Sequence, residues 1–357
     1  MSKATHFFLG ANSGRGFQNL FGRFCAPEDH YDLIVLKGGP GAGKSTMMMK
    51  IGQAMEARGE QVEYLHCSGD PDSVDAVHIP RIRTAVVDGT SPHVIEPVYP
   101  AAADRYVNLG QFYDIAAAKA SRAEIIRCTD GCSAAYRRAY RALSAAGQVA
   151  DSAAALVAEG MDREKLMRRT DGIIGREIRG KGSGRGVCLR FLGSITHKGP
   201  VWRFDSVEAL CPRVYQVQDS FGLAAPMLEQ IHRAAAVRGY GAIVCPDPEH
   251  LDRMEHLLLP ELGLAFVTSR EGMEYMGTAY RRVRVDAMVS PAYYKQHKSR
   301  LRFCRRMVGE LRQEGMDALR EAKTCHDELE AVYRPYVDFA GVNGVTEEEI
   351  RRIEGYC

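Results

Sequence analysis

The stretch DLIVLKGGPGAGKSTMMMKIGQAMEARGEQVEYL, residues 32–65, decides the fold. Residues 33–36 (LIVL) form a short apolar run typical of a buried strand. The glycine-rich segment 38–45 follows with the spacing G-x-x-x-x-G-K-S, and residues 44–58 are good helix formers that end before Gly59. The order strand, glycine-rich loop, helix predicts an α/β fold. It also favours a phosphate-binding loop over a chance match among the 35 glycines.

Each residue type in this loop has a physical role in holding phosphate. Glycines adopt backbone angles closed to other residues, so that amide groups converge on phosphate oxygens at the positive end of the helix dipole. We expect Lys44 to contact the β- and γ-phosphates and the Ser45 hydroxyl to bind Mg²⁺. The predicted nucleotide-binding residues are Gly38, Gly39, Pro40, Gly41, Ala42, Gly43, Lys44, Ser45 and Thr46. No base pocket is visible, so ATP is expected over GTP only because it is the commoner ligand.

A second apolar run, residues 84–87 (TAVV), predicts a strand that ends in Asp88. Phosphate-loop proteins place a magnesium-organising aspartate at this point, beside the strand of the loop. We therefore predict Lys44 and Asp88 as catalytic residues, and Ser45 and Asp88 as metal-side ligands. Gly89 follows Asp88, where many motor ATPases carry a water-activating glutamate.

Four residues remain as accessory candidates that orient water or another nucleophile. They are Asp70, Asp75, His93 and Glu96. The polar segment 66–75 (HCSGDPDSVD) is expected at the carboxyl edge of the sheet, where α/β proteins bind ligands. Its Asp, Ser, Gly and Pro residues are equally typical of turns, so a structural role stays open.

The two halves of the chain repeat one another. FLG at 8–10 recurs at 191–193, KIGQAMEARG (50–59) resembles QIHRAAAVRG (230–239), and IPRIRTAVVDG (79–89) falls on LPELGLAFVTS (259–269). Asp70 and Asp75 match Asp247 and Asp252. Similarities that keep their order over so much of a chain indicate an internal duplication.

The second copy lacks the chemistry of the first. Lys44 is replaced by Ala224, Ser45 by Ala225, and Asp88 by Thr268. We therefore predict one nucleotide site per chain. A trans-acting arginine from the second copy is a further hypothesis, with Arg213 and Arg270 as candidates at the equivalent edge.

The remaining sequence predicts helices and a boundary between two domains. Residues 114–167 and 293–334 suit long amphipathic helices, forming hairpins that stand off each sheet, and 160–166 resembles 344–350. Asp162 is predicted as a helix N-cap, and Thr346 with Glu349 fits a capping box. The segment GKGSGRG (180–186) separates a predicted active domain, 1–179, from a degenerate domain, 187–357. The expected fold is thus α/β, with tandem phosphate-loop NTPase-type parallel sheets, each carrying a helical appendage.

Composition narrows the class of protein. The net charge is +2, so no global field attracts nucleic acid or an anionic membrane. Residues 295–306 carry six Lys or Arg and no acid, but with so balanced a chain we expect a solvated helix face rather than nucleic-acid binding. The apolar runs are too short to span a bilayer and no signal-peptide core is present, so a cytoplasmic protein without membrane contact is expected. The ten cysteines show no Cys-x-x-Cys pair and are expected to be free thiols.

The motifs GGPGAGKST, HCSGDPDSVD and DGTSPH, with a degenerate second copy, resemble a little-characterised family of bacterial tandem phosphate-loop ATPases. The resemblance covers most of the chain and implies a bacterial cytoplasmic ATP-binding protein. Members often keep a lysine loop in the second half as well, and Ala224 and Ala225 depart from that pattern.

Three functions fit these observations. The first is magnesium-dependent ATP hydrolysis that drives a change between the domains. The second is a kinase for a nucleotide or another small molecule, favoured by Gly89 and by the acidic segment 70–75. The third is a nucleotide-sensing protein with slow turnover that acts on a protein partner, favoured by the degenerate half.

Overall fold

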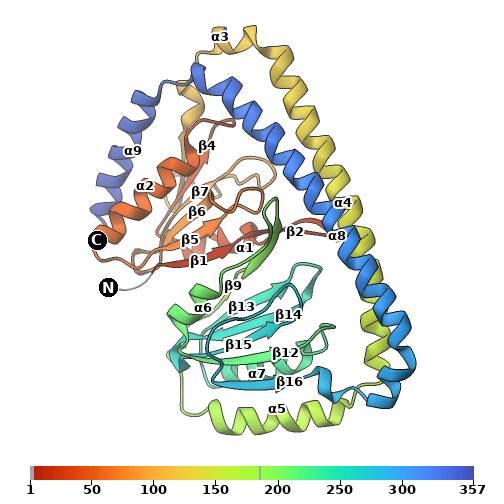
Figure 1. Ribbon diagram of the computed structural model, residues 1–357. Helices are drawn as coiled ribbons and strands as arrows, with labels where there is room; N and C mark the ends of the chain where they lie inside the picture. Colours follow the sequence, from red (N-terminus) through yellow and green to blue (C-terminus); the bar gives the residue numbers. More distant parts are fainter. Residues whose placement is uncertain (1–3, 185) are drawn as a thin grey trace.

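The structure is a computed structural model and describes residues 4–184 and 186–357. Residues 1–3, and Arg185 in the predicted linker 180–186, lie outside the described residues. The described chain is α/β, with one six-stranded sheet in each half and two long helices along one side (Figure 1). No helix in 4–184 or 186–357 is long and apolar enough to cross a membrane.

The sheet of the first half has the strand order β1-β5-β6-β7-β4-β8. Its strands are β1 (Thr5–Phe8), β4 (Asp32–Lys37), β5 (Glu63–His66), β6 (Val74–Ile79), β7 (Thr84–Asp88) and β8 (Asp104–Asn108). A separate hairpin, β2 (Gly10–Ser13) and β3 (Gly16–Asn19), follows β1. The helices of this half are α1 (Phe21–Phe24), α2 (Lys44–Ala57) and α3 (Ile115–Ala120), with the 3₁₀ turns η1 (Pro27–Asp29), η2 (Pro80–Ile82) and η3 (Leu109–Phe112).

The sheet of the second half has the order β16-β12-β15-β14-β13-β9. Its strands are β9 (Val187–Leu189), β12 (Arg213–Gln218), β13 (Ala242–Asp247), β14 (His250–Leu259), β15 (Leu264–Ser269) and β16 (Arg281–Arg284). The hairpin β10 (Gly193–Thr196) and β11 (Gly199–Trp202) corresponds to β2–β3. Helices α6 (Phe204–Leu210) and α7 (Ala225–Val237) and the turns η4 (Pro260–Leu262) and η5 (Asp286–Met288) complete this half.

The two sheets have the same topology. Read in the opposite direction, the second sheet has the order β9-β13-β14-β15-β12-β16. Each of these strands corresponds to the strand at the same place in β1-β5-β6-β7-β4-β8. Small details repeat as well: η2 and η4 both begin with proline, and the residues that follow them, Arg83 and Gly263, have φ angles of 51° and 57°. This equal arrangement is what the predicted duplication requires.

The prediction that the sheets are parallel is wrong for one strand in each half. β6 runs antiparallel to β5 and β7, and β14 runs antiparallel to β13 and β15. A parallel crossover needs about a dozen residues, whereas the links 67–73 and 80–83 are far shorter. The chain therefore turns back on itself, and both sheets are mixed.

The long helices pair across the two halves. α4 (Arg122–Glu159) lies along α8 (Pro291–Tyr333), so the hairpin expected within each half is instead made by one helix from each (Figure 1). α5 (Arg163–Glu177) then packs in the core of the second sheet, through Leu166 and Ile173. α9 (Phe339–Glu354), which follows the turn η6 (Arg334–Tyr336), packs in the core of the first sheet, through Val342 and Ile353.

The division into 1–179 and 187–357 stays a prediction. The strands follow it, but α5, which precedes the boundary, lies on the second sheet, and α9, which follows it, lies on the first. Each half thus receives its last helix from the other half.

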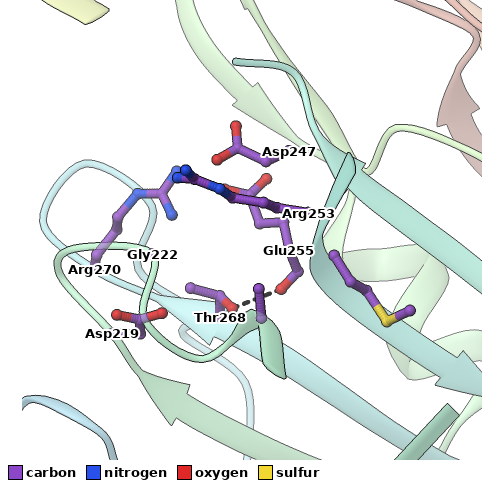
Figure 2. A pocket seen from close by; sticks show the side chains of 9 residues that line it. Asp219, Gly222, Asp247, Arg253, Glu255, Thr268 and Arg270 are labelled. Carbon is purple, nitrogen blue, oxygen red and sulfur yellow. Dashed lines mark hydrogen bonds and ion pairs between the residues drawn. The ribbon is translucent and has the colours of Figure 1, made fainter. Parts of the chain in front are cut away.

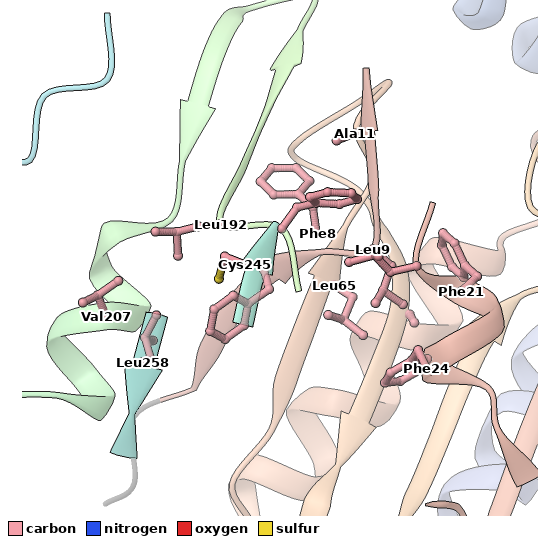
Figure 3. Packing of buried hydrophobic residues seen from close by; sticks show 14 of the residues in the cluster. Phe8, Leu9, Ala11, Phe21, Phe24, Leu65, Leu192, Val207, Cys245 and Leu258 are labelled. Carbon is pink, nitrogen blue, oxygen red and sulfur yellow. The ribbon is translucent and has the colours of Figure 1, made fainter. Parts of the chain in front are cut away.

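A shared apolar core joins the two halves. Phe8, Phe21 and Leu65 of the first half belong to this cluster, and Figure 3 shows Phe8 on the side toward Leu192 and Cys245 of the second half. The FLG segments meet there, because the amides of Phe8 and Phe191 each donate to the other's carbonyl at 2.9 Å. The second half contributes Phe191, Leu192, Val207, Cys245 and Leu258 to the same cluster.

The hairpins exchange contacts in the same reciprocal way. The amide of Gly14, in the first hairpin, donates to the Glu249 carboxylate at 3.0 Å, and Lys198, in the second hairpin, pairs with Asp72. The loops 70–72 and 247–249 therefore each hold the hairpin of the other half.

Of the two predicted caps, one is confirmed. The Asp162 carboxylate accepts from the amide of Lys165 at 2.9 Å and begins α5. Thr346 lies inside α9, where its hydroxyl donates to the Val342 carbonyl, so the capping box with Glu349 is wrong. Asp338 is the N-cap instead, because its carboxylate accepts from the amides of Ala340 and Gly341.

Candidate nucleotide site

The glycine-rich loop joins the end of β4 to the start of α2. β4 is buried between β7 and β8, which fixes the loop at the carboxyl edge of the sheet. Gly38, Gly41 and Gly43 have φ angles of 156°, 71° and 86°, which side-chain-bearing residues rarely adopt. At Gly38 a Cβ atom would also stand 3.1 Å from the Cβ atom of Ala42. The fold therefore requires glycine at these points.

Within the described residues, the amides of Gly41, Gly43 and Lys44 donate to no protein acceptor. They lie where α2 begins, so the helix dipole adds positive potential to the same place. Amides gathered at a helix N-terminus form a ready-made anion site.

The ammonium group of Lys44 lies within this loop. Its Nζ donates to the carbonyls of Gly38 at 2.7 Å and Gly39 at 3.0 Å, and stands 3.6 Å from Oδ2 of Asp88. The side chains of Lys44 and Asp88 are largely buried, which strengthens their attraction. A phosphate would offer Lys44 a fully charged acceptor in place of two neutral carbonyls.

Asp88 lies where the sequence places it, at the end of the strand beside β4. The register pairs Leu36 with Asp88, one residue before the end of β4. Oδ1 of Asp88 accepts from the amide and the hydroxyl of Thr90, at 2.9 and 2.6 Å, which holds the carboxylate in one orientation.

The oxygen atoms around Lys44 suit a hard cation such as Mg²⁺. Ser45 Oγ lies 2.8 Å from Ser73 Oγ and accepts from the amide of Val74, so β6 supports the predicted ligand from the side. Ser45 and Asp88 supply hydroxyl and carboxylate oxygens, the ligands that Mg²⁺ prefers, and both lie next to the amides that would hold phosphate. The residues present therefore fit the ion.

Two accessory candidates, Asp75 and His93, form a buried pair. His93 Nε2 stands 3.6 Å from Oδ2 of Asp75, and the imidazole stacks on Phe21 with ring centroids 4.2 Å apart. Burial lowers the pKa of His93, but the nearby carboxylates of Asp75 and Asp88 outweigh it, so that the pKa is raised overall. The pair lies close to Asp88 yet is shielded from solvent.

The other two candidates point elsewhere. Asp70 pairs with Lys323 of α8 at 3.3 Å. Glu96 pairs with Lys37 at 2.8 Å and with the Tyr106 hydroxyl on β8, on the side of β4 away from β7. Among the described contacts, Glu96 therefore takes no part in the group around Lys44.

The sequence did not predict that the C-terminal helices α8 and α9 pack against the glycine-rich loop. A Cβ atom on Gly41 would stand 3.2 Å from the carbonyl oxygen of Glu330, in α8, and one on Gly43 would touch Val342 of α9 at 3.4 Å. Tyr113 donates its hydroxyl to the Pro40 carbonyl at 2.7 Å. Residues 330–342 belong to the second repeat, so the site is built from both halves.

Neither arginine proposed from the sequence reaches the loop. Arg213 begins β12, at the amino edge of its sheet, and pairs with Glu177 at 2.7 Å. Arg270 is half-buried in the second half, where it pairs with Glu255. The strand direction places Arg213 at the opposite end of its sheet from the loop. A different cation, Lys323 of α8, reaches the segment 70–73, where it pairs with Asp70.

The loop of the second half is filled by its own side chain. Asp219 directly follows β12, as Gly38 directly follows β4, and Figure 2 shows it beside the loop at Gly222. In this alignment α7 begins at Ala225 where α2 begins at Lys44, so Ala225, and not the predicted Ala224, takes the place of Lys44. The Asp219 carboxylate accepts from the amides of Leu223 and Ala224 at 2.9 and 2.7 Å. Burial raises the pKa of Asp219, and those amides offset part of the shift. The carboxylate thus occupies the amide cradle that would otherwise hold a phosphate.

Other polar side chains around the second loop are also bonded to one another. Thr268, at the position of Asp88, donates its hydroxyl to the Glu255 carbonyl at 2.6 Å, and Arg270 pairs with the Glu255 carboxylate (Figure 2). Strand pairing aligns Glu255, not Asp252, with Asp75, because β14 extends further than β6.

Comparisons with known proteins found no matching protein family, no matching curated protein and no similar solved structure. The resemblance to tandem phosphate-loop ATPases therefore stays a prediction from the motifs.

Proposed function

We propose that residues 38–46 bind the triphosphate of ATP and that the chain hydrolyses ATP at this one site. The observation that carries the proposal is the set of free amides of Gly41, Gly43 and Lys44 at the start of α2. An anion-binding cradle with a lysine inside it and an aspartate 3.6 Å away suits a magnesium nucleotide. GTP remains the less expected ligand.

Different residues would bind the phosphates and the magnesium ion. The loop amides hold the phosphates, and Lys44 leaves the carbonyls of Gly38 and Gly39 for phosphate oxygens. Ser45 and Asp88 would hold the ion, which would supply positive charge beside the phosphates. Thr90 and Ser73 keep these two ligands in place.

The residues described around Lys44 include no exposed acid or base placed to orient an attacking water. Gly89 follows Asp88, and the nearest pair, Asp75 and His93, is buried. We therefore propose slow basal hydrolysis. The second loop takes no part, because Asp219 already occupies its amides.

A nucleotide sensor is the second candidate, and one observation favours it. α8 touches the loop through Glu330 and the 70–73 segment through Lys323, then continues along α4 to the other half. A change in the loop would be passed directly to this helix. A small-molecule kinase remains a third candidate, with an unidentified acceptor.

The test is phosphate release from ATP with Mg²⁺, together with equilibrium binding of ATP, for the wild type, Lys44→Ala and the control Lys50→Ala. Lys50 is an exposed lysine on the same helix that bonds Asn343 at 2.8 Å. Loss of both activities in Lys44→Ala but not in Lys50→Ala is expected. ATP binding that survives Lys44→Ala unchanged would overturn the proposal.

Added acceptors separate the candidates. Phosphate release without any acceptor supports hydrolysis, while ADP formed only with a pool of small-molecule acceptors supports a kinase. Tight, Lys44-dependent binding without turnover supports the sensor.

A further inference from the structure

We propose that the second half carries a binding surface for the phosphodiester backbone of nucleic acid, built from β16 and the first turns of α8. This inference is independent of the nucleotide site. It reverses the expectation drawn from the sequence, because the structure shows how the cations of this region are placed and paired.

The charge of this region is strongly one-sided. Residues 281–312 contain ten Lys or Arg against two acids, Asp286 and Glu310, so the segment carries eight net positive charges while the whole chain carries +2. Asp286 is already engaged by the amide and hydroxyl of Ser220. The remainder of the chain is therefore acidic overall, and the positive charge is concentrated at one place.

The cations of the surface are also unpaired. Of these ten, only Arg305 has a carboxylate within 4 Å in the described part of the chain, that of Glu271 at 3.4 Å. The exposed groups that make up the proposed surface are Arg281, Arg284, Lys298, Arg300, Arg302 and Arg306. Like charges concentrated in one segment without counter-charges repel one another, and a polyanion would relieve that repulsion.

Aromatic rings stand among these cations. Tyr280 is 42% exposed with the Arg281 guanidinium 5.2 Å from its ring centroid. Phe303 is 44% exposed, and Arg300 lies 5.5 Å from its centroid. Proteins that bind single-stranded nucleic acid stack its bases on exposed rings of this kind, often with arginine guanidinium groups beside them.

The packing of α8 favours nucleic acid over an anionic membrane, whose lipid phosphates would attract these cations as well. The apolar side of this part of α8 is already buried, since Leu301 and Cys304 pack with Ala153 and Val157 of α4. No apolar helix face is therefore left in this segment to enter a bilayer. Eight of the ten cations are arginines, whose planar fork suits phosphate oxygens.

The pieces of the surface are adjacent in the fold. β16 is an edge strand, and η5 connects it to α8. The amide of Asp162, at the start of α5, donates to the Met288 carbonyl, so α5 lies beside the same region (Figure 1). The far end of α8 reaches the nucleotide loop at Glu330.

The experiment measures binding of labelled single-stranded and double-stranded DNA and RNA by fluorescence anisotropy across a salt series. The variant replaces Arg300, Arg302 and Arg306 with Ala. Its matched control replaces Arg122, Arg137 and Arg141, three exposed arginines of α4, with Ala and so removes the same number of positive charges. Circular dichroism establishes that both variants are folded.

We expect the wild type to bind at low salt, and the α8 variant to bind weakly with a salt slope smaller by about three. The α4 variant should bind like the wild type. No binding by the folded wild type at low salt would overturn the proposal, as would equal loss in both variants. Binding to anionic vesicles but not to nucleic acid would also overturn it, in favour of a membrane.

Discussion

The ion pair between Glu63 and Arg190 offers a sharp test of how the two halves are held together. Glu63 begins β5 of the first sheet, and Arg190 follows β9 of the second. Nε and Nη2 of Arg190 donate to the two carboxylate oxygens of Glu63 at 2.8 Å each, and both side chains are buried. His78 adds a contact at 3.1 Å, and the Arg190 guanidinium lies 4.9 Å from the Phe24 ring centroid.

Removing one partner is expected to be costly. Glu63→Ala leaves a buried guanidinium without its carboxylate, which destabilises a protein by about 3–5 kcal/mol. That is a large share of the roughly 5–15 kcal/mol by which a typical domain is stable. The double variant Glu63→Leu with Arg190→Met removes both buried charges, and we expect it to unfold within about 1 kcal/mol of the wild type or to be more stable.

The effect should depend on pH in a defined direction. Burial raises the pKa of Glu63, but Arg190 and His78 more than offset this and hold the pKa well below its usual range. Because the folded carboxyl has the lower pKa, its stabilisation is complete above the unfolded value of about 4.3 and is lost as the pH falls below it. The difference between wild type and Glu63→Ala should therefore shrink below about pH 4.

Urea unfolding, followed by circular dichroism and by the fluorescence of the single tryptophan, Trp202, measures these differences. Glu328→Ala is the control, because Glu328 pairs with Arg127 at 3.5 Å on an exposed surface and should change nothing measurable. If Glu63→Ala were as stable as this control, or the double variant no better than Glu63→Ala, the argument from burial would be refuted.

Three further predictions concern the loops. Gly41→Ala should weaken ATP binding about tenfold, since its φ of 71° costs an alanine roughly 1–2 kcal/mol and the added Cβ meets the Glu330 carbonyl; unchanged affinity by isothermal titration would contradict this. Lys323→Ala breaks the pair with Asp70 and so loosens the 70–73 segment, whose Ser73 holds Ser45; it should lower turnover more than ATP affinity, and a loss confined to affinity would show that Lys323 only helps to bind. Asp219→Ala should lower stability by about 2 kcal/mol in thermal melts, because buried amides lose their acceptor, while ATP binding stays intact; weakened ATP binding would argue that the second loop takes part.

Local features of the first half could be predicted because they rest on neighbouring residues. The strand 33–36 lies in β4 and the helix 44–58 agrees with α2 to within one residue, since turn chemistry and helix propensity act over short distances. The position of Asp88 beside β4 followed from the rule that strands next to a phosphate loop end in acids. The sequence similarity between the halves likewise anticipated two sheets of equal strand order.

Features that depend on chain direction or distant contacts could not be predicted. No strand was predicted over VDAVHI, because its first residues fell in the polar segment 66–75, and a pattern of this kind reads the same in a parallel or an antiparallel strand. Thr346 and Glu349 match a capping box by spacing, but the helix begins earlier, at the Asp338 cap. Both errors arise because short patterns are compatible with several places in a fold.

The exchange of helices between the halves changes how the degenerate copy should be understood. Because α9 completes the core beneath the loop and α8 touches Gly41, the second repeat contributes to the proposed nucleotide site although its own loop is closed by Asp219. A duplicated chain can lose one site without losing the copy when that copy supplies walls for the other site. Selection for the first site would then preserve the second sheet and its long helix while leaving Ala224 and Ala225 free of any demand for phosphate chemistry.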